Sequence, residues 1–443
     1  MSWGVGTMIP DLMRERLLSV VEPTPRGRVC RLVGMHLEVE GVEAGIGDAV
    51  VVDLGGAKTL IAEVVGLDNQ RLICMPFKEM TGVRYGNPAW SLKRPPLFPV
   101  GPALLGRVLD SEGRPIDQLG QLTPEDLVVI DGRAPSPMDR TLIDEQLSLG
   151  IRVIDTLVPC GIGQRLGVFA GAGVGKSSLL SMMIRGADVD VIVLALVGER
   201  GREVKEFLEH DLGPEGLAKA AIVVATSDAP PLLRVRAALA ATRVAEWFRD
   251  QGKRVLLVMD SLTRLGLAQR EIGLSAGEPP SVRGYPPSVF ALMARLLERA
   301  GTSSRGSITG IYSVLVDGDD LNDPIADSAR SVLDGHIVLS RSQAQRGLYP
   351  AVSVLESISR LETAILDDSQ RALAHEARRL YAELDQVRDL IDLGAYVAGS
   401  NPNVDRALAT VPRLTQLFAQ DLMDLTPASA TWSRLSQALG VAQ

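Results

Sequence analysis

A glycine-rich segment that ends in lysine and serine has the composition of a phosphate-binding loop. The segment is Ala170-Gly171-Ala172-Gly173-Val174-Gly175-Lys176-Ser177, which follows an apolar run and precedes a helix-like stretch that begins at Ser178. Glycines allow backbone N–H groups to curl around phosphate oxygens, and the N-terminus of the following helix favours negative charge. We expect Lys176 to reach the β- and γ-phosphates of a nucleoside triphosphate and the Ser177 hydroxyl to ligate Mg²⁺. The strict pattern has glycine where this chain has Ala170, and a single methyl group leaves the assignment intact.

Two carboxylates at the ends of apolar runs are candidates for the chemistry beside this loop. Asp260 ends the run 255–260, and a carboxylate in this position organises the Mg²⁺ shell of nucleotide hydrolases. Glu199 follows the apolar run 191–197, where a carboxylate polarises an attacking water. Spacing alone does not separate Glu199 from Glu203, and a solvated surface cluster stays open as an alternative.

Length and charge limit the class of protein. The chain has 443 residues, enough for two or three domains, and its hydrophobic content of 46% supports a well-buried core. The formal net charge of −8 argues against broad binding to nucleic acid, which needs clustered lysine and arginine. We therefore expect no nucleic-acid partner.

The cysteines and the apolar runs bear on the compartment. Cys30, Cys74 and Cys160 are far apart and show no metal-ligand spacing, so we expect a reducing cytoplasm rather than a disulfide framework. Residues 1–10 lack the basic region and apolar core of a signal peptide. The longest apolar runs, such as 191–197, are far short of a membrane span and predict buried strands of a parallel sheet.

Hydrophobic patterning predicts two folded parts before the C-terminal region. Short alternating runs separated by glycine turns predict a small β-barrel within residues 25–97. Apolar runs that alternate with helical stretches predict an α/β domain with a mostly parallel sheet over residues 98–365. The expected strands of this sheet are residues 191–197, 221–225, 255–259, 308–315 and 336–339.

Helical patterning predicts the two ends of the chain. After residue 365, apolar side chains recur at three- and four-residue steps, which predicts a helical domain over residues 366–443 with interruptions at Gly394 and Pro402. Residues 1–24 contain a short amphipathic pattern. A partner-binding role and packing on its own domain both stay open for this segment.

Eight further segments give the chain a family resemblance. Over residues 25 to 410 it resembles the type III protein-export ATPases of flagella and injectisomes, which are related to the catalytic and non-catalytic subunits of rotary ATP synthases. The segments that carry the resemblance are GERGREVKEF (198–207), DSLTR (260–264), AQREIGL (268–274), GEPP (277–280), GYPPSVFA (284–291), LERAG (297–301), VDGDDLNDPIAD (316–327) and LDGHIVLSR (333–341).

The resemblance implies specific roles for individual residues. It implies that Lys176, Ser177 and the loop around them bind the phosphates and Mg²⁺. Asp260 would be the carboxylate that organises the metal. Glu199 activates water, and Arg200 lies near the γ-phosphate of ATP. Two roles rest on the resemblance alone: Arg360 matches an arginine finger that reaches the neighbouring subunit's nucleotide, and Tyr349 matches the aromatic side chain that stacks on adenine. The predicted nucleotide-contacting residues are Gly171, Ala172, Gly173, Val174, Gly175, Lys176, Ser177, Ser178 and Tyr349. Tyr396 is a second candidate for lining the base pocket.

The resemblance also implies an assembly and its partners. We expect a homohexameric ring that hydrolyses ATP with Mg²⁺ at the cytoplasmic face of the inner-membrane export apparatus, releasing or unfolding substrates of type III export. The implied partners are a stator or regulator protein, a central stalk met by the proline-rich loop 277–287, export chaperones, substrates and the export gate. The segment Gly394-Ala395-Tyr396 favours flagellar export over an injectisome. A rotary ATP synthase subunit and a non-catalytic nucleotide-binding ring subunit are the alternatives.

Overall fold

The computed structural model describes residues 26–316, 318, 320 and 322–441. The amphipathic segment expected within residues 1–24 lies outside the described residues. The chain divides into two compact units, one that extends to Pro96 and one that begins at Leu97, and each is described by itself. None of the helices in the described part is long and apolar enough to cross a membrane.

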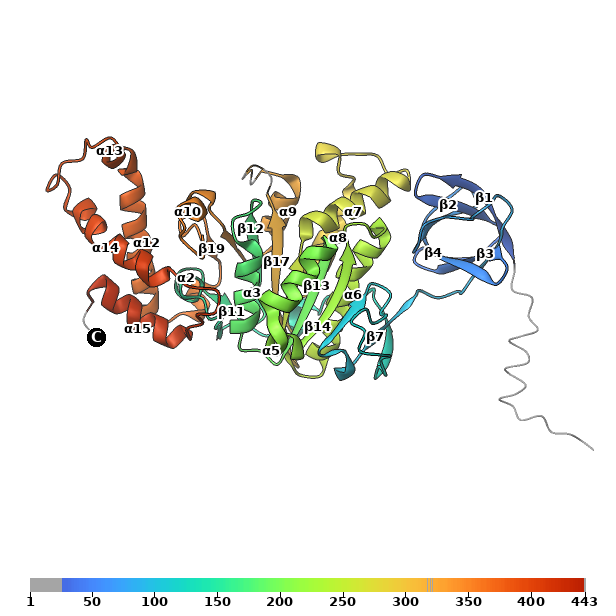
Figure 1. The fold of residues 1–443 in the computed structure, drawn as a ribbon, viewed down its shortest axis with the longest axis horizontal. Helices are drawn as coiled ribbons and strands as arrows, with labels where there is room; N and C mark the ends of the chain where they lie inside the picture. The colour runs from blue at the N-terminus through green and yellow to red at the C-terminus, as the bar shows by residue number, and fades with distance from the viewer. Residues whose placement is uncertain (1–25, 317, 319, 321, 442–443) are drawn as a thin grey trace, which may run out of the picture. The chain divides into compact units, whose positions relative to one another are not determined.

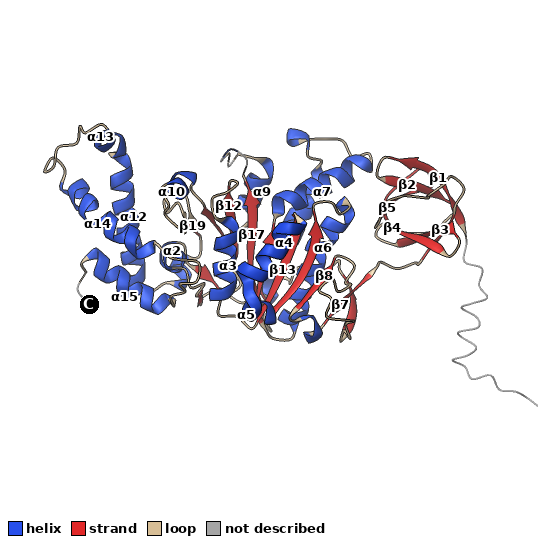
Figure 2. Cartoon of the chain, viewed as in Figure 1, coloured by secondary structure: helices blue, strands red, loops and turns tan. Residues whose placement is uncertain are grey.

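The first unit contains a closed antiparallel barrel with the strand order β1-β2-β5-β4-β3-β6 (Figure 2). Its strands are β1 (Gly27–Val33), β2 (His36–Glu40), β3 (Ala49–Gly55), β4 (Lys58–Asp68), β5 (Arg71–Pro76) and β6 (Pro88–Ser91). Alternate residues such as Val50, Val52 and Val64 point inward and are fully buried, because side chains alternate across a strand. The predicted barrel is confirmed.

The second unit is built on a nine-stranded sheet, most of it parallel (Figure 1). The order along the main path is β19-β18-β12-β17-β15-β13-β14-β8, and β16 pairs with β17. The strands are β8 (Arg107–Asp110), β12 (Arg165–Ala170), β13 (Val191–Glu199), β14 (Ala220–Thr226), β15 (Arg254–Asp260), β16 (Gly301–Thr302), β17 (Ser307–Leu315), β18 (Gly335–Val338) and β19 (Ile358–Ser359). All five strands expected from apolar runs are present in this sheet.

Helices cover the sheet, as a parallel sheet buried on both faces requires. Most of them follow the end of a strand, so the carboxyl ends of the strands and the beginnings of the helices meet at one edge of the sheet, here called the carboxyl edge. The helices are α2 (Arg152–Leu157), α3 (Lys176–Gly186), α4 (Gly201–Glu206), the π-helical turn η3 (Phe207–Leu212), α5 (Gly213–Ala218), α6 (Pro231–Asp250), α7 (Leu262–Ser275), α8 (Pro287–Glu298), α9 (Pro324–Val332), α10 (Arg341–Gln345) and α11 (Glu362–Ile365).

Short elements connect these layers. They are the strand pairs β7 (Leu97–Val100) with β9 (Asp126–Val129) and β10 (Gln146–Leu147) with β11 (Cys160–Gly161), and the 3-10 turns η1 (Pro102–Leu104), η2 (Pro137–Asp139) and η4 (Val282–Gly284). The η4 turn lies within the proline-rich loop 277–287, whose prolines disfavour a longer helix.

The chain ends in a group of helices that packs on the same core. These are α12 (Asp368–Gln386), α13 (Arg388–Asp392), α14 (Pro402–Phe418) and α15 (Ala428–Leu439). A capping box at Asp367 and Gln370 starts α12, and α14 begins at Pro402 after the predicted break. Leu380 and Leu414 belong to the same hydrophobic cluster as the buried face of α3. The predicted C-terminal helices are confirmed.

Candidate functional site

The glycine-rich loop connects β12 to α3 at the carboxyl edge of the sheet. Gly173 and Gly175 adopt φ angles of 76° and 92°, a left-handed conformation that favours glycine. Gly175 is the N-cap of α3, so the first N–H groups of that helix lack intrahelical partners. Val174 is buried in the core, which leaves only its backbone to contact a ligand. The loop therefore offers backbone donors and a helix N-terminus to an anion.

The two predicted carboxylates lie close to the loop lysine. The Nζ atom of Lys176 forms an ion pair with Asp260 Oδ1 and lies 3.9 Å from Glu199 Oε1. The parallel pairing of β13 with β15 aligns Leu196 with Asp260, so both strands end at the same edge. The sheet thus brings together three residues that are far apart in the sequence.

Burial and neighbouring charges shift the acidity of Glu199. Its side chain is 10% exposed, and burial together with repulsion from Asp260 raises its pKa to about 7. Lys176 and Arg264 act in the opposite direction because their positive charges favour the carboxylate. The Oε1 atom of Glu199 is buried and has no hydrogen-bond partner within the described part of the chain. This carboxylate is suited to accept a proton from water near neutral pH.

A cavity of about 230 Å³ lies beside these groups. Ser177, Glu199 and Asp260 line it, together with Glu203, Glu206 and Asp211. A serine hydroxyl and a carboxylate at one cavity are oxygen donors of the kind that Mg²⁺ prefers, the remaining ligands being phosphate oxygens and water. The residues present therefore fit a magnesium ion that arrives with a nucleotide.

Tyr349 lies next to the phosphate loop. A side-chain carbon placed on Gly175 would come within 3.3 Å of the Tyr349 ring, so loop and ring are nearly in contact. Tyr349 is 46% exposed, and its carbonyl accepts a hydrogen bond from the Gln420 N–H at 2.9 Å. A cavity of about 490 Å³ adjoins it and is lined in part by Tyr381 and Phe418. A half-exposed aromatic residue next to the phosphate loop is suited to contact a nucleobase.

Tyr396 is not among the residues that line this cavity. Its hydroxyl donates to the Asn401 carbonyl at 3.2 Å and to Asp405 at 3.0 Å, in the connection between α13 and α14. Glycine at 394 and proline at 402 turn the chain there, so Tyr396 stabilises a loop of the C-terminal helices.

Arg360 is exposed and lies at the edge of the sheet opposite the loop. Its N–H donates to the Asp334 carbonyl at 2.9 Å, and Asp334 precedes β18. Leu166, near the beginning of β12, pairs with Gly335. Arg360 is thus level with the beginning of β12, whereas the phosphate loop follows its end, roughly 17 Å away at the rise of a parallel strand. One copy of the chain does not bring Arg360 to its own Lys176.

Arg200 and Ser178 are exposed beside the cluster. Arg200 is the residue before α4, and its Nη1 atom lies 3.1 Å from Glu203 Oε1, so it has a surface ion pair. Ser178 is in the first turn of α3. Neither side chain touches Lys176, Glu199 or Asp260 in the contacts that the structure gives.

Two residues of the cluster were not predicted from the sequence. Arg264 Nη2 lies 3.2 Å from Glu199 Oε2, and its other nitrogen donates to the Gly198 carbonyl. Ser313 Oγ donates to Asp260 Oδ1 at 2.6 Å. Arg264 is in the first turn of α7, directly after Asp260, and Ser313 is a polar residue inside the apolar run 308–315. The sequence signals that could have identified them are an arginine four residues after Asp260 and a serine within an apolar strand.

Fold and cluster together define a phosphate-loop nucleotide-binding protein, and comparisons with known proteins specify its family. Residues 150–359 match the ATP synthase alpha/beta family, nucleotide-binding domain, and residues 366–437 match the T3SS EscN ATPase C-terminal domain. The flagellum-specific ATP synthase of Bacillus subtilis is 46% identical over 414 residues, which cover 92% of this chain and 94% of that protein. The type 3 secretion system ATPase of Xanthomonas euvesicatoria is 45% identical over 432 residues, covering 97% and 98%.

A solved structure agrees with the sequence relatives. The assembled ATPase EscN from the type III secretion system of enteropathogenic E. coli matches with a TM-score of 0.89 and 41% identity, covering 93% of this chain and 100% of that one. EscN in complex with its central stalk EscO matches with a TM-score of 0.86 and 40% identity. The chain belongs to the family of flagellum-specific ATP synthases and type 3 secretion system ATPases. The resemblance inferred from the sequence is confirmed.

Proposed function

We propose that this ATPase hydrolyses Mg·ATP at interfaces between copies of itself, in a homohexameric ring that energises type III protein export. The observation that carries the proposal is the division of the charged groups within one chain. Lys176, Glu199 and Asp260 meet at the carboxyl edge of the sheet, whereas Arg360 is exposed at the opposite edge. A second copy is needed to supply an arginine to the first copy's nucleotide.

The proposed chemistry follows from the positions of the groups. Backbone N–H groups of the loop and the Lys176 ammonium bind the phosphates, and Lys176 exchanges its ion pair with Asp260 for the γ-phosphate when nucleotide arrives. Ser177 and Asp260 hold Mg²⁺, which neutralises charge on the phosphates. Glu199 orients the attacking water and accepts its proton.

Three further groups complete the proposed site. Arg360 of a neighbouring copy stabilises the charge that develops on the transferred phosphoryl group. Tyr349 stacks on the adenine, and Arg200 approaches the γ-phosphate after leaving its surface partner Glu203. We assign this chemistry to a domain of residues 98–365, between a barrel domain of residues 25–97 and a helical domain of residues 366–443.

The partners are proposed from the relatives. EscN has been solved in an assembled form and with its central stalk EscO, which supports a homo-oligomer and a stalk partner for this chain. A stator or regulator protein, export chaperones, their substrates and the export gate complete the proposal, with the ring at the cytoplasmic face of the inner membrane.

Mixed assemblies test the division of the site. We expect Lys176→Ala protein to be inactive and Arg360→Ala protein to keep only a small, measurable residual rate, and we expect activity to be regained when the two are mixed. In a mixed ring, an intact phosphate loop from an Arg360→Ala subunit can meet an intact Arg360 from a Lys176→Ala subunit. Random mixing should restore up to about a quarter of the parental rate, because about a quarter of the interfaces pair the two intact halves. Absence of any regain, in mixtures shown by light scattering to assemble, would contradict the proposal.

A further inference from the structure

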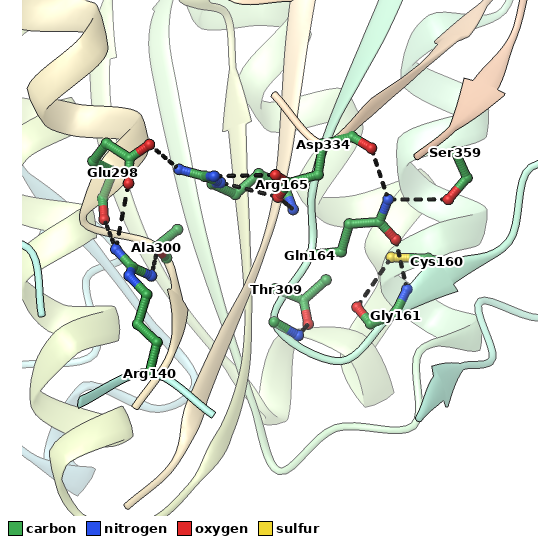
Figure 3. A network of polar contacts seen from close by, with 11 residues as sticks. Arg140, Cys160, Gly161, Gln164, Arg165, Glu298, Ala300, Thr309, Asp334 and Ser359 are labelled. Carbon is green, nitrogen blue, oxygen red and sulfur yellow. Dashed lines mark hydrogen bonds and ion pairs between the residues drawn. The ribbon is translucent and has the colours of Figure 1, made fainter. Parts of the chain in front are cut away.

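A network of polar side chains surrounds the first residue of β12, away from the nucleotide cluster (Figure 3). Arg165 lies between two carboxylates: its Nε and Nη2 atoms each donate to Asp334 at 3.0 Å, and its Nη1 atom lies 2.6 Å from Glu298. The Arg165 N–H also donates to the Asp334 carboxylate at 3.0 Å, and the Asp334 N–H donates to the Arg165 carbonyl at 2.9 Å. Side chain and backbone together therefore fix Asp334 against β12.

Gln164 extends the network to β19, the strand beyond β18. It is fully buried, and its Nε2 atom donates to the Asp334 carbonyl at 3.2 Å and to Ser359 Oγ at 3.1 Å. Its Oε1 atom accepts the Gly161 N–H at 2.7 Å. Both polar atoms of this amide therefore form hydrogen bonds, and its nitrogen links the Asp334 carbonyl to the Ser359 hydroxyl.

The network ends at Arg360. The Asp334 carbonyl that accepts Gln164 also accepts the Arg360 N–H, at 2.9 Å. Beyond its backbone, Arg360 donates from Nη2 to the Arg330 carbonyl at 3.2 Å, and the side chain is otherwise exposed. The position of the guanidinium thus depends on this bond and on how firmly the backbone at residue 360 is held.

We infer that Arg165, Asp334 and Gln164 are positioning residues for Arg360, and that they hold its backbone so that the guanidinium reaches the neighbouring subunit's nucleotide. The inference rests on the proposed role of Arg360 between subunits. Bidentate bonds between arginine and a carboxylate are geometrically specific, and buried bonds of this kind restrict motion. A catalytic group displaced by about 1 Å can lose about 100-fold in rate, so support of this kind matters for turnover.

Asp334→Asn is the primary test because it keeps the size of the side chain. It removes the charge and turns one acceptor oxygen into a donor that faces the donors of Arg165. We expect kcat for ATP to fall at least about tenfold and KM to stay within about twofold, since nucleotide binds at the other edge of the sheet. The double variant Asp334→Asn with Arg360→Ala should be no slower than Arg360→Ala alone. A double variant that is slower by the full tenfold would show that Asp334 acts independently of Arg360 and would overturn the inference.

The chain offers a matched control at the same sheet edge. Arg254 is the first residue of β15, and its guanidinium donates to both oxygens of Glu145 at 3.2 and 3.1 Å. Glu145→Gln removes a bidentate ion pair of the same type, more exposed than that of Arg165 and Asp334, which has no contact with Arg360 in the described structure. It should leave kcat within about twofold of the parent, and a loss equal to that of Asp334→Asn would mean that any ion pair at this edge has the same effect.

Mixing separates this inference from the proposed function. Asp334→Asn protein mixed with Lys176→Ala protein should regain activity, because the Lys176→Ala subunits supply a well-positioned Arg360. If Arg360→Ala regains activity with Lys176→Ala but Asp334→Asn does not, the positioning role is wrong and the function between subunits stands. If neither mixture regains activity, the proposed function is wrong, and the inference is wrong with it.

Ser359→Ala is the second variant if Asp334→Asn fails to fold. It removes only the hydroxyl that accepts the Gln164 amide. We expect a smaller loss of kcat, about threefold, that mixing with Lys176→Ala protein also restores. Parental kcat in Ser359→Ala would overturn the inference.

Discussion

Glu199 and Asp260 share Lys176 as a neighbour but differ in their other contacts and in how burial affects them. Asp260 has an ion pair with Lys176 and a hydrogen bond from Ser313, which leaves it suited to hold a cation rather than to accept a proton. Glu199 has Arg264 on one oxygen and no hydrogen bond on the other within the described residues. An oxygen without a hydrogen bond can accept a proton from water, so we expect Glu199 to act as the base and Asp260 to hold the cation.

Replacing Glu199 tests this division at the level of one atom. Glu199→Gln keeps the shape and removes the proton acceptor, so kcat should fall by 10²- to 10⁴-fold while ATP affinity changes by less than about threefold. Glu203→Gln is the comparison variant: Glu203 lines the same cavity but is paired with Arg200, so its loss of kcat should be at least about tenfold smaller than that of Glu199→Gln. Steady-state hydrolysis and nucleotide titration measure both quantities. Parental activity in Glu199→Gln would favour another base, and equal losses in the two variants would leave the base unidentified.

The raised pKa of Glu199 predicts an acid limit to activity. The group acts as a base only when ionised, so kcat/KM, which reports the free enzyme, should rise with pH through the Glu199 pKa of about 7. Arg264→Gln removes a cation that stabilises the carboxylate, so it should move the midpoint of this limb to higher pH. Because the γ-phosphate of ATP also titrates near neutrality, the shift between variants is the informative quantity. A midpoint that is the same in the parent and in Arg264→Gln would exclude Glu199 as the titrating group.

At the scale of elements, the sequence predicted the sheet and the loop well because both depend on local signals. Apolar runs located the strands, and the glycine spacing located the turn into α3. The sequence did not reveal Arg264 or Ser313, because their contacts depend on which strands are neighbours: Ser313 follows Tyr312, which pairs with Met259 next to Asp260. The hydrogen bond of Tyr396 to Asp405 was not predicted either, since an aromatic residue near a turn has no local signal for its partner.

The contact between Tyr349 and the loop of α3 predicts how the base is bound. Tyr349→Ala should weaken nucleotide binding by about 10-fold or more, because stacking of a base on an aromatic ring contributes about 1–3 kcal/mol. Tyr349→Phe keeps the ring and should stay within about threefold of the parent. Tyr396→Ala is the control and should not change affinity, since its hydroxyl bonds Asp405 instead. Titration with a fluorescent ATP analogue measures all three, and unchanged affinity in Tyr349→Ala would place the base elsewhere.

At the scale of the whole molecule, the comparisons establish the family but not the export system. Relatives from flagella and from type 3 secretion systems match at 46% and 45% identity, so the flagellar preference based on Gly394-Ala395-Tyr396 stays a prediction. The segment contacts its own helices, with the Tyr396 hydroxyl on Asp405 and the Tyr396 N–H on the Leu390 carbonyl. The described contacts of this segment therefore stabilise the connection between α13 and α14.

A site divided between copies makes activity depend on protein concentration. Specific ATPase activity should be very low in dilute solution, rise more steeply than linearly, and level off once rings are complete, because only an interface joins Lys176 with a neighbour's Arg360. Light scattering on the same samples should show mass increasing over the same range. A variant that carries both Lys176→Ala and Arg360→Ala, added in excess to the parent, should lower total activity by occupying positions in the ring and breaking the interfaces on either side. If specific activity is constant from the lowest concentrations and is unaffected by that double variant, each copy contains a complete site. Arg360 would then have to act within its own chain, despite its place at the opposite edge of the sheet.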